Sequence, residues 1–253
     1  MKKILGIAVL VLAAIIIISA SRNNPGAILN RISSDNFKGD VKELVYKVYL
    51  FGVFPVGEAV IADKGLDKFG GEDVYRLSAS AKGTALISKI YPFEADLDSY
   101  LEPGTFLPLT FRQTLKTKDK ETVKEVSYDQ KNGIMRIADV KRTIFPDTYE
   151  PLSALYKLRR MDLNAAGVFD FNINTNQKNY AFTGTINKEE SRLKNETVNI
   201  FRLKGKIFRR DKNPYHQSHF EIVFLDNPRK TPLYIKVFAS GALLTVRLDG
   251  NQL

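Results

Sequence analysis

Two groups of side chains in this sequence have types and spacings that could do chemistry. Glu94, Asp96 and Asp98 alternate with apolar residues, so a strand would place all three carboxylates on one face. Paired carboxylates act as acid and nucleophile in glycosidases, and clustered carboxylate oxygens bind calcium. His216 and His219 have the H-x-x-H spacing of some metal sites, but no third ligand stands beside them. Since like charges on an exposed strand face are usually solvated, we expect neither group to be a functional site.

Other catalytic signatures are missing from the sequence. The chain has no cysteine, which excludes thiolate nucleophiles and disulfides, and it has no serine elbow, P-loop or G-x-G-x-x-G pattern. We therefore expect a protein that is not an enzyme and that has no cofactor and no metal. Glycan hydrolysis stays an alternative that would require Asp96 or Asp98 to face a second acid, such as Asp139, across a pocket.

Positive charge is in excess. The 38 Lys and Arg residues against 28 Asp and Glu give a formal net charge of +10. Such a surface can bind a lipid, a glycolipid or an anionic envelope polymer, whereas nucleic acid is not an expected partner of an exported chain. A basic run interleaved with Ile207 and Phe208 could dock on anionic lipid or glycan, or it could be a solvated turn; its members are Lys204, Lys206, Arg209, Arg210 and Lys212.

One amphipathic helix is expected near the middle of the chain, from Asp147 to Arg160. Pro151 suits the first helical position, where its missing N–H costs nothing. Leu152, Leu155 and Tyr156 then recur at the spacing of one helix face. This apolar stripe would cover part of a β-sheet.

Three residues are candidate ligand-binding residues: Tyr156 and Arg159 on this helix, and Arg229 in a later turn. Arg159 shares the apolar stripe, so its guanidinium must reach the rim of the sheet or find an acceptor. It would form an ion pair with an acid such as Asp147 or Asp139, or it would anchor a ligand. Arg229 belongs to the turn DNPRKTP, where it would either bind a ligand or cap the loop.

The rest of the chain after about residue 40 alternates between apolar and polar residues, as strands do. Leu44, Tyr46, Val48 and Leu50 fall on one face, and about a dozen such segments follow. Pro55 indicates an edge or a bulge, and Asn132-Gly133 predicts a type I′ hairpin turn. No linker separates the segments, so we expect a single domain over residues 41–253, preceded by a tether at 21–40.

The first 20 residues have the pattern of an export signal. Lys2 and Lys3 precede an apolar run from Ile4 to Ile18, and small residues follow it. The segment could be a cleaved signal peptide, or an uncleaved anchor in the inner membrane, since the roughly 17 residues from Ile4 to Ala20 would barely span a bilayer. In either case we expect a periplasmic or cell-envelope protein.

Three stretches of the chain resemble a family of exported bacterial proteins known as domain of unknown function 3108. They are YKVYLFGVFPVGEA (46–59), DTYEPLSALYKLR (147–159) and FLDNPRKTPLYIKVFASGALLTVRL (224–248). The resemblance implies an exported all-β domain in which a curved antiparallel sheet wraps around the central helix, similar to the half-barrels of outer-membrane lipoprotein carriers. It implies no activity.

The sequence therefore predicts an all-β protein, with a large curved antiparallel sheet or open barrel around one helix. A sheet that a helix covers incompletely leaves an apolar groove. We expect the protein to bind or carry a lipid or another amphipathic ligand in the cell envelope. The alternative is a structural or assembly factor that acts through protein partners, which a broad apolar patch on the outside of the sheet would favour.

Overall fold

The computed structural model describes residues 43–175, 177–210, 217–239 and 241–252. The predicted signal or anchor and the tether lie outside these residues, so the three-part division of the chain stays a prediction. No helix in the described part is long and apolar enough to cross a membrane. The elements of this part are β1 (Glu43–Leu50), β2 (Phe54–Phe69), β3 (Glu72–Gly83), α2 (Ala85–Ile90), β4 (Phe93–Leu101), β5 (Pro108–Thr117), β6 (Glu121–Asp129), β7 (Ile134–Ile137), β8 (Val140–Thr143), β9 (Thr148–Tyr149), α3 (Pro151–Arg160), β10 (Val168–Thr175), β11 (Lys178–Leu193), β12 (Glu196–Arg209), β13 (Ser218–Leu225), β14 (Pro232–Ala239), β15 (Ala242–Leu248) and the 3-10 turn η1 (Gly250–Gln252).

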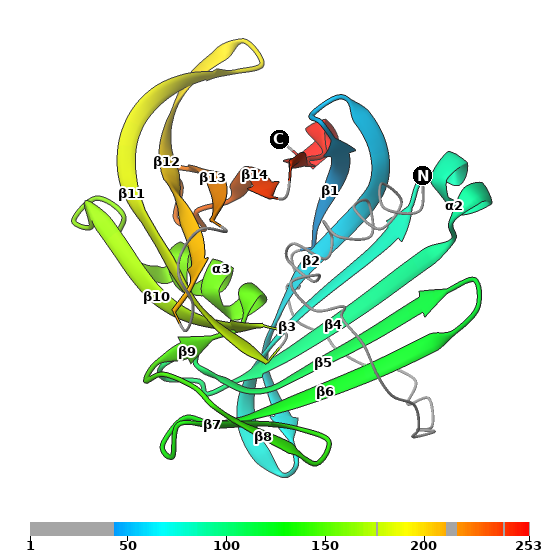
Figure 1. The fold of residues 1–253 in the computed structure, drawn as a ribbon. Coiled ribbons are helices and arrows are strands. Elements are labelled where there is room, and N and C mark those ends of the chain that lie inside the picture. The colour runs from blue at the N-terminus through cyan, green and yellow to red at the C-terminus, as the bar shows by residue number, and fades with distance from the viewer. Residues whose placement is uncertain (1–42, 176, 211–216, 240, 253) are drawn as a thin grey trace.

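The strands of the described residues form one 15-stranded sheet in the order β8-β7-β6-β5-β4-β3-β2-β1-β15-β14-β13-β12-β11-β10-β9. The first and last strands are neighbours in its middle, because β1 pairs with β15. From this pair one arm runs to β8 and the other runs to β9. Figure 1 shows the two arms curving toward each other with α3 inside the curve. The predicted curved sheet around one helix is confirmed.

Alternation along the strands separates an apolar inner face from a mostly polar outer face. Tyr46 and Val48 of β1 and Leu77 and Ala81 of β3 are buried in the main apolar cluster, and this cluster also contains the buried residues of α3. The predicted facing of β1 is therefore correct. Pairs of neighbouring strands are antiparallel except for β9 and β10, which are parallel.

Two predicted turns have different outcomes. The register of β1 against β2 shifts where Tyr49 pairs with Pro55, so the predicted irregularity at Pro55 is confirmed. The type I′ turn at Asn132-Gly133 is wrong. Gly133 has φ +64, but Asn132 is not in the positive-φ region that a type I′ turn also requires. Asp129 instead accepts hydrogen bonds from the backbone N–H and the side chain of Asn132, which closes a longer loop.

The central helix begins later than predicted. α3 starts at Pro151, the first helical residue as expected, but residues 147–149 are not helical. Asp147 has φ +50, and Thr148 and Tyr149 form the short strand β9. The helix is capped by Glu150, whose carboxylate accepts from the backbone N–H groups of Leu152 and Ser153.

Sharp curvature of the sheet depends on a pair of glycines. Gly184 of β11 lies directly opposite Gly205 of β12. The rings of Phe169 and Phe220 lie against these glycines, where a Cβ at Gly184 would meet Phe169 at 2.9 Å. Because neither residue of this glycine pair has a side chain, the two strands can bend here and the aromatic rings can pack on the backbone.

The register of the strands defines two ends of the barrel. The α2 end carries the β1–β2 turn, α2 with its flanking residues, and the β5–β6, β10–β11 and β14–β15 turns. The opposite end carries the β2–β3, β4–β5, β11–β12 and β13–β14 turns and the start of β1. α2 was not predicted, because the six-residue segment ALISKI is too short to show helical periodicity.

Candidate functional site

α3 places Tyr156 in a chain of hydrogen bonds at the opposite end. The Tyr156 hydroxyl donates to the Tyr75 hydroxyl (2.5 Å), and the latter donates to Asp63 Oδ1 (2.6 Å). Burial, together with the hydrogen bond to Asp63, raises the pKa of Tyr75, and burial also raises the pKa of Tyr156. Both phenols therefore stay protonated at neutral pH. The chain ties α3 to the β2–β3 hairpin, and neither phenol supplies a base.

Arg159 lies beside this chain but has a different partner from the one expected. Its Nε donates to the backbone oxygen of Arg229 (3.2 Å), where the sequence predicted an ion pair with Asp147 or Asp139. A ten-residue helix carries Arg159 away from Asp147, toward the β13–β14 turn. The guanidinium also lies 5.9 Å from the centre of the Tyr156 ring. Arg159 thus links the end of α3 to the β13–β14 turn.

The structure brings the three predicted ligand-binding residues together. Arg229 is exposed in the β13–β14 turn, and its backbone oxygen is the acceptor for Arg159. The loop is closed by Asn227 instead of Arg229, since Asn227 Oδ1 accepts from the backbone N–H of Thr231 (3.1 Å). Nothing in the geometry separates a ligand role from a structural one, so ligand binding at Tyr156, Arg159 and Arg229 stays a prediction.

A second polar cluster lies at the start of α3 and was missed by sequence reasoning. Glu150 is 1% exposed, and its Oε1 accepts from Ser99 Oγ of β4 (2.7 Å). A cavity of ≈ 20 Å³, about the size of one water molecule, lies beside it between Lys124, Tyr128 and Asn174. The signal available in the sequence was Ser99, a polar residue on the otherwise apolar face of β4.

Burial controls the charges of this cluster. It raises the pKa of Glu150, although the hydrogen bonds from Ser99, Leu152 and Ser153 oppose the shift. It lowers the pKa of Lys124. Both shifts follow from the cost of keeping a charge away from water. The first role of Glu150 is structural, because it caps α3 and fixes the helix to β4.

The inner face has partly buried apolar side chains at both ends of the barrel, among them Leu44 and Leu233 at the opposite end. α3 contacts the sheet toward the opposite end, through its links to Tyr75 and to the β13–β14 turn. Toward the α2 end, side chains of the same inner face are only partly buried, although they pack against the main cluster. They are Leu50, Ile87, Ile207 and Val237. We call these four residues the apolar mouth.

The carboxylates of β4 share one face as predicted, and Arg76 lies between Asp98 and a second acid, Asp67, whose Oδ2 is 3.4 Å from Arg76 Nη1. Asp98 is held by Arg76 Nη2 (2.8 Å), and Asp96 lies opposite Ser80 and Thr114. Burial raises the pKa of Asp96, and Lys116 opposes this. Asp98 and Asp67 thus share one guanidinium, which is the arrangement of a structural ion pair.

The remaining sequence candidates are surface features where the structure describes them. His219 is exposed on β13, and His216 lies outside the described residues. Within the described ranges, no three side chains of His, Cys, Asp or Glu form a metal-binding group. In the basic run, Lys204 and Lys206 are exposed, and Arg210 pairs with Asp170 (2.7 Å).

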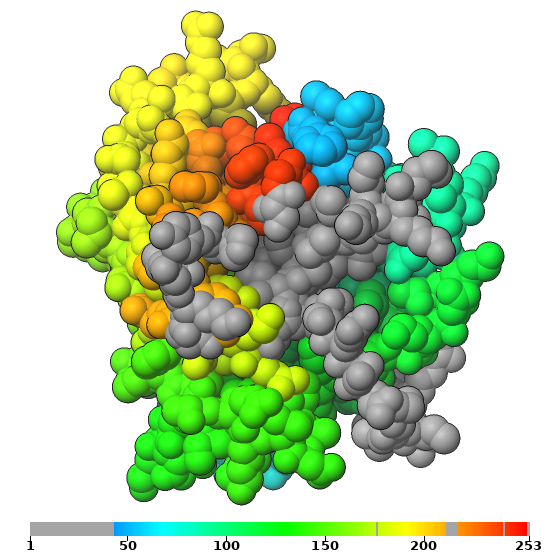
Figure 2. Space-filling model, in the orientation of Figure 1, coloured from blue at the N-terminus to red at the C-terminus, as the bar shows by residue number. Residues whose placement is uncertain are grey.

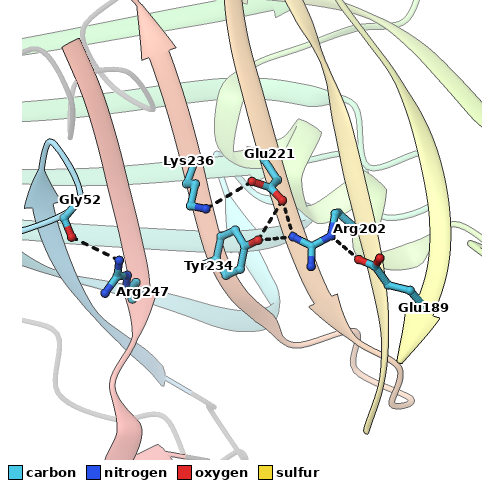
Figure 3. A network of polar contacts seen from close by, with 7 residues as sticks. All are labelled: Gly52, Glu189, Arg202, Glu221, Tyr234, Lys236 and Arg247. Atoms are coloured by element: carbon cyan, nitrogen blue, oxygen red, sulfur yellow. Dashed lines mark hydrogen bonds and ion pairs between the residues drawn. The ribbon is translucent and has the colours of Figure 1, made fainter. Parts of the chain in front are cut away.

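The outer face of β11–β14 carries a polar network (Figure 3). Arg202 of β12 contacts Glu189, Glu221 and Tyr234, and Lys236 Nζ lies 3.4 Å from Glu221 Oε2. Although burial acts to raise the pKa of Glu221, the hydrogen bonds from Arg202 and Tyr234 outweigh it and hold this pKa below its usual value. Charged side chains from four strands pair with one another here, so this part of the outer face is polar and faces solvent.

The curved sheet around an internal helix places the chain among barrel-like all-β proteins. One similar structure is the crystal structure of a β-barrel-like protein of domain of unknown function DUF1849 from Brucella abortus, with a TM-score of 0.54 and 10% sequence identity. The alignment covers 81% of this chain and 94% of that one. A DUF1089 family protein from Pseudomonas aeruginosa aligns with 84% of this chain and 95% of its own, at a TM-score of 0.37 and 11% identity.

The family is given by a match over residues 45–246 to the model "Protein of unknown function (DUF3108)". The chain belongs to this family, as the resemblance in its sequence predicted. No curated protein matches the chain. The family has no known activity, and neither the family match nor the barrel-like neighbours indicate catalysis.

Proposed function

We propose that this protein binds an apolar or amphipathic molecule, such as a lipid, at the apolar mouth. The observation that carries the proposal is a group of partly exposed apolar side chains on the concave face at the α2 end. Leu50, Ile207 and Val237 face the same interior as the buried core, yet they remain partly exposed. Partly exposed apolar side chains on a concave sheet are the usual lining of a ligand site.

The proposed setting is the cell envelope. Its support is the N-terminal sequence, in which Lys2 and Lys3 precede an apolar run. A carrier of this kind needs no catalytic group, which agrees with the solvated carboxylates of β4. Protein partners are a weaker alternative, since the outer face of β11–β14 carries a charged network where an assembly factor would need an apolar patch.

Ligand binding can be tested with matched substitutions at neighbouring positions of β12. Ile207→Glu places a charge in the mouth, whereas Lys206→Glu changes an exposed residue on the outer face of the same strand. With a dansyl-labelled fatty acid as probe, we expect Ile207→Glu to weaken binding at least about tenfold, because a carboxylate is costly to desolvate. Lys206→Glu should bind as the wild type does.

Two results would argue against the proposal. One is equal probe binding by the wild type and the Ile207→Glu variant, with both shown to be folded by circular dichroism. The other is the absence of any lipid in native mass spectra of protein purified from cell envelopes.

A further inference from the structure

The α2 end exposes a group of large apolar side chains on three adjacent turns. Their exposed fractions lie between 49% and 69%. They are Phe51, Val53 and Phe54 on the β1–β2 turn, Leu86 and Ile90 on α2, and Phe238 at the end of β14. We call this set the apolar rim.

Backbone hydrogen bonds hold the three turns of the rim together. The N–H of Thr84, which precedes α2, donates to the oxygen of Val56 just after the β1–β2 turn (3.1 Å). The N–H of Phe51 donates to the oxygen of Leu243, just after the β14–β15 turn (2.6 Å). In Figure 2 the surface of the β1–β2 turn (blue) lies between that of β14 and β15 (orange to red) and that of α2 (turquoise). The rim is therefore one continuous edge.

α2 turns its apolar residues in two directions. Ile87 packs against the core and fixes the helix to the barrel, while Leu86 and Ile90, four residues apart, point away from it. A helix whose only task was to close the end of the barrel would present polar residues on this outer face. The outward pair thus has no partner within the described part of the chain.

The charges around the rim indicate what it contacts. Residues 51–54, 84–92 and 238–242 contain no acidic residue, and Lys89 lies between Leu86 and Ile90 on α2. The exposed Arg247 adds a second cation, since its Nη2 donates to the oxygen of Gly52 in the β1–β2 turn (3.2 Å). In the β5–β6 turn beside α2, Lys118 and Lys120 are balanced by Asp119 and Glu121. Lysine is depleted from protein–protein interfaces, whereas apolar side chains flanked by lysine are typical of segments that lie in the surface of an anionic bilayer.

We propose that the apolar rim docks the α2 end of the barrel on an anionic phospholipid bilayer, with Lys89 and Arg247 at the level of the headgroups. The docking does not depend on a ligand inside the barrel. It would place the apolar mouth next to the membrane, because the mouth and the rim share the same end.

The absence of tryptophan from the sequence allows a direct test on the full chain. Phe54→Trp introduces one indole in the rim, and Val168→Trp introduces one at a similarly exposed position at the start of β10, the end of that strand away from the β10–β11 turn. Vesicles of phosphatidylglycerol and phosphatidylcholine carrying brominated acyl chains are then added to each variant. We expect the emission of Phe54→Trp to shift to shorter wavelength and to be quenched, and that of Val168→Trp to stay unchanged.

Further variants in the Phe54→Trp background separate the apolar and the electrostatic contributions to vesicle binding. Leu86→Ser and Ile90→Ser should each lower the affinity for these vesicles roughly tenfold, the factor expected for withdrawing one such side chain from an apolar phase. Vesicles of pure phosphatidylcholine, or high salt, should weaken binding as well. These variants should keep wild-type binding of the fatty-acid probe, whereas Ile207→Glu should lose the probe and keep the docking.

Equal quenching of the two indoles would overturn the proposal, since it would mean that the chain lies on the membrane without using this end. An emission of Phe54→Trp that vesicles do not change would also overturn it, and the rim would then be a surface for a protein partner or a second copy of the chain.

Discussion

At the scale of single residues, Glu150 connects more of the structure than any candidate chosen from the sequence. Its carboxylate accepts from Ser99 of β4 and from two backbone N–H groups of α3, so one buried side chain starts the helix and fixes it to the sheet. The sequence did predict that Pro151 begins the helix. It could not show that the preceding glutamate is buried, because Ser99 lies 51 residues away in the chain.

The shifted pKa of Glu150 predicts a pH dependence of stability. Burial raises this pKa in the folded state, so the folded protein holds the proton above the unfolded value of about 4.3. The stabilisation from this group is complete below that pH and is lost as pH rises through the folded-state value. Glu150→Gln removes the titration. We therefore expect the free energy of unfolding of the wild type, relative to Glu150→Gln, to fall as pH rises above about 4.3.

Urea unfolding of both proteins between about pH 4 and pH 8 measures this difference, and other titrating groups cancel because they are common to both. A difference that stays constant, or that grows with pH, would show that the hydrogen bonds to the carboxylate outweigh its burial.

At the scale of elements, the strands were predictable and their bending was not. Alternation identified the inner face of β1 correctly, because burial on one face forces a period of two. The sequence did not indicate that Gly184 and Gly205 act together, because they become neighbours only through the register of β11 against β12. α2 was missed for a related reason: the outward-facing Leu86 and Ile90 do not follow the pattern of a helix that covers a core.

The glycine pair predicts a large loss of stability on a small substitution. A Cβ at position 205 would overlap the backbone oxygen of Thr183 and the ring of Phe220, so Gly205→Ala must push the two strands apart. We expect a loss of about 3 kcal/mol in the free energy of unfolding. Gly167→Ala is the matched control, since nothing lies within 4 Å of its added Cβ, and it should change stability by less than about 0.5 kcal/mol. Thermal or urea unfolding measures both, and similar effects for the two would contradict this account of the curvature.

At the scale of the whole molecule, the sheet ends in two short edge strands that lie close along the chain, β8 and β9. Side chains bridge this seam in place of a regular ladder. Asn172 donates to the oxygen of Pro146 (2.7 Å), Asn179 to that of Thr143 (2.9 Å) and Gln130 to that of Thr148 (2.8 Å). These contacts cover backbone groups that an open edge would leave free to pair with other chains. The sequence predicted the open barrel but not this closure, because the hydrogen-bond acceptors of these amide side chains lie far away in the chain and cannot be identified from the sequence.

The seam predicts that the barrel opens locally when its bridges are removed. Asn172→Ala deletes one hydrogen bond, so we expect it to lower the free energy of unfolding by about 1 kcal/mol. Asn179→Ala deletes two, because Asn179 Oδ1 also accepts from Asn174 Nδ2 (2.7 Å), and should cost about 2 kcal/mol. Together they should speed hydrogen exchange of the amides in residues 140–149, while those of β1 and β15 in the middle of the sheet keep their protection. Asn187→Ala, an exposed position on the same strand as Asn179, should leave exchange at the seam unchanged. Faster exchange throughout the sheet in the double variant would show that the seam unfolds together with the rest of the barrel. In that case the two arms of the barrel could not move apart locally at the seam.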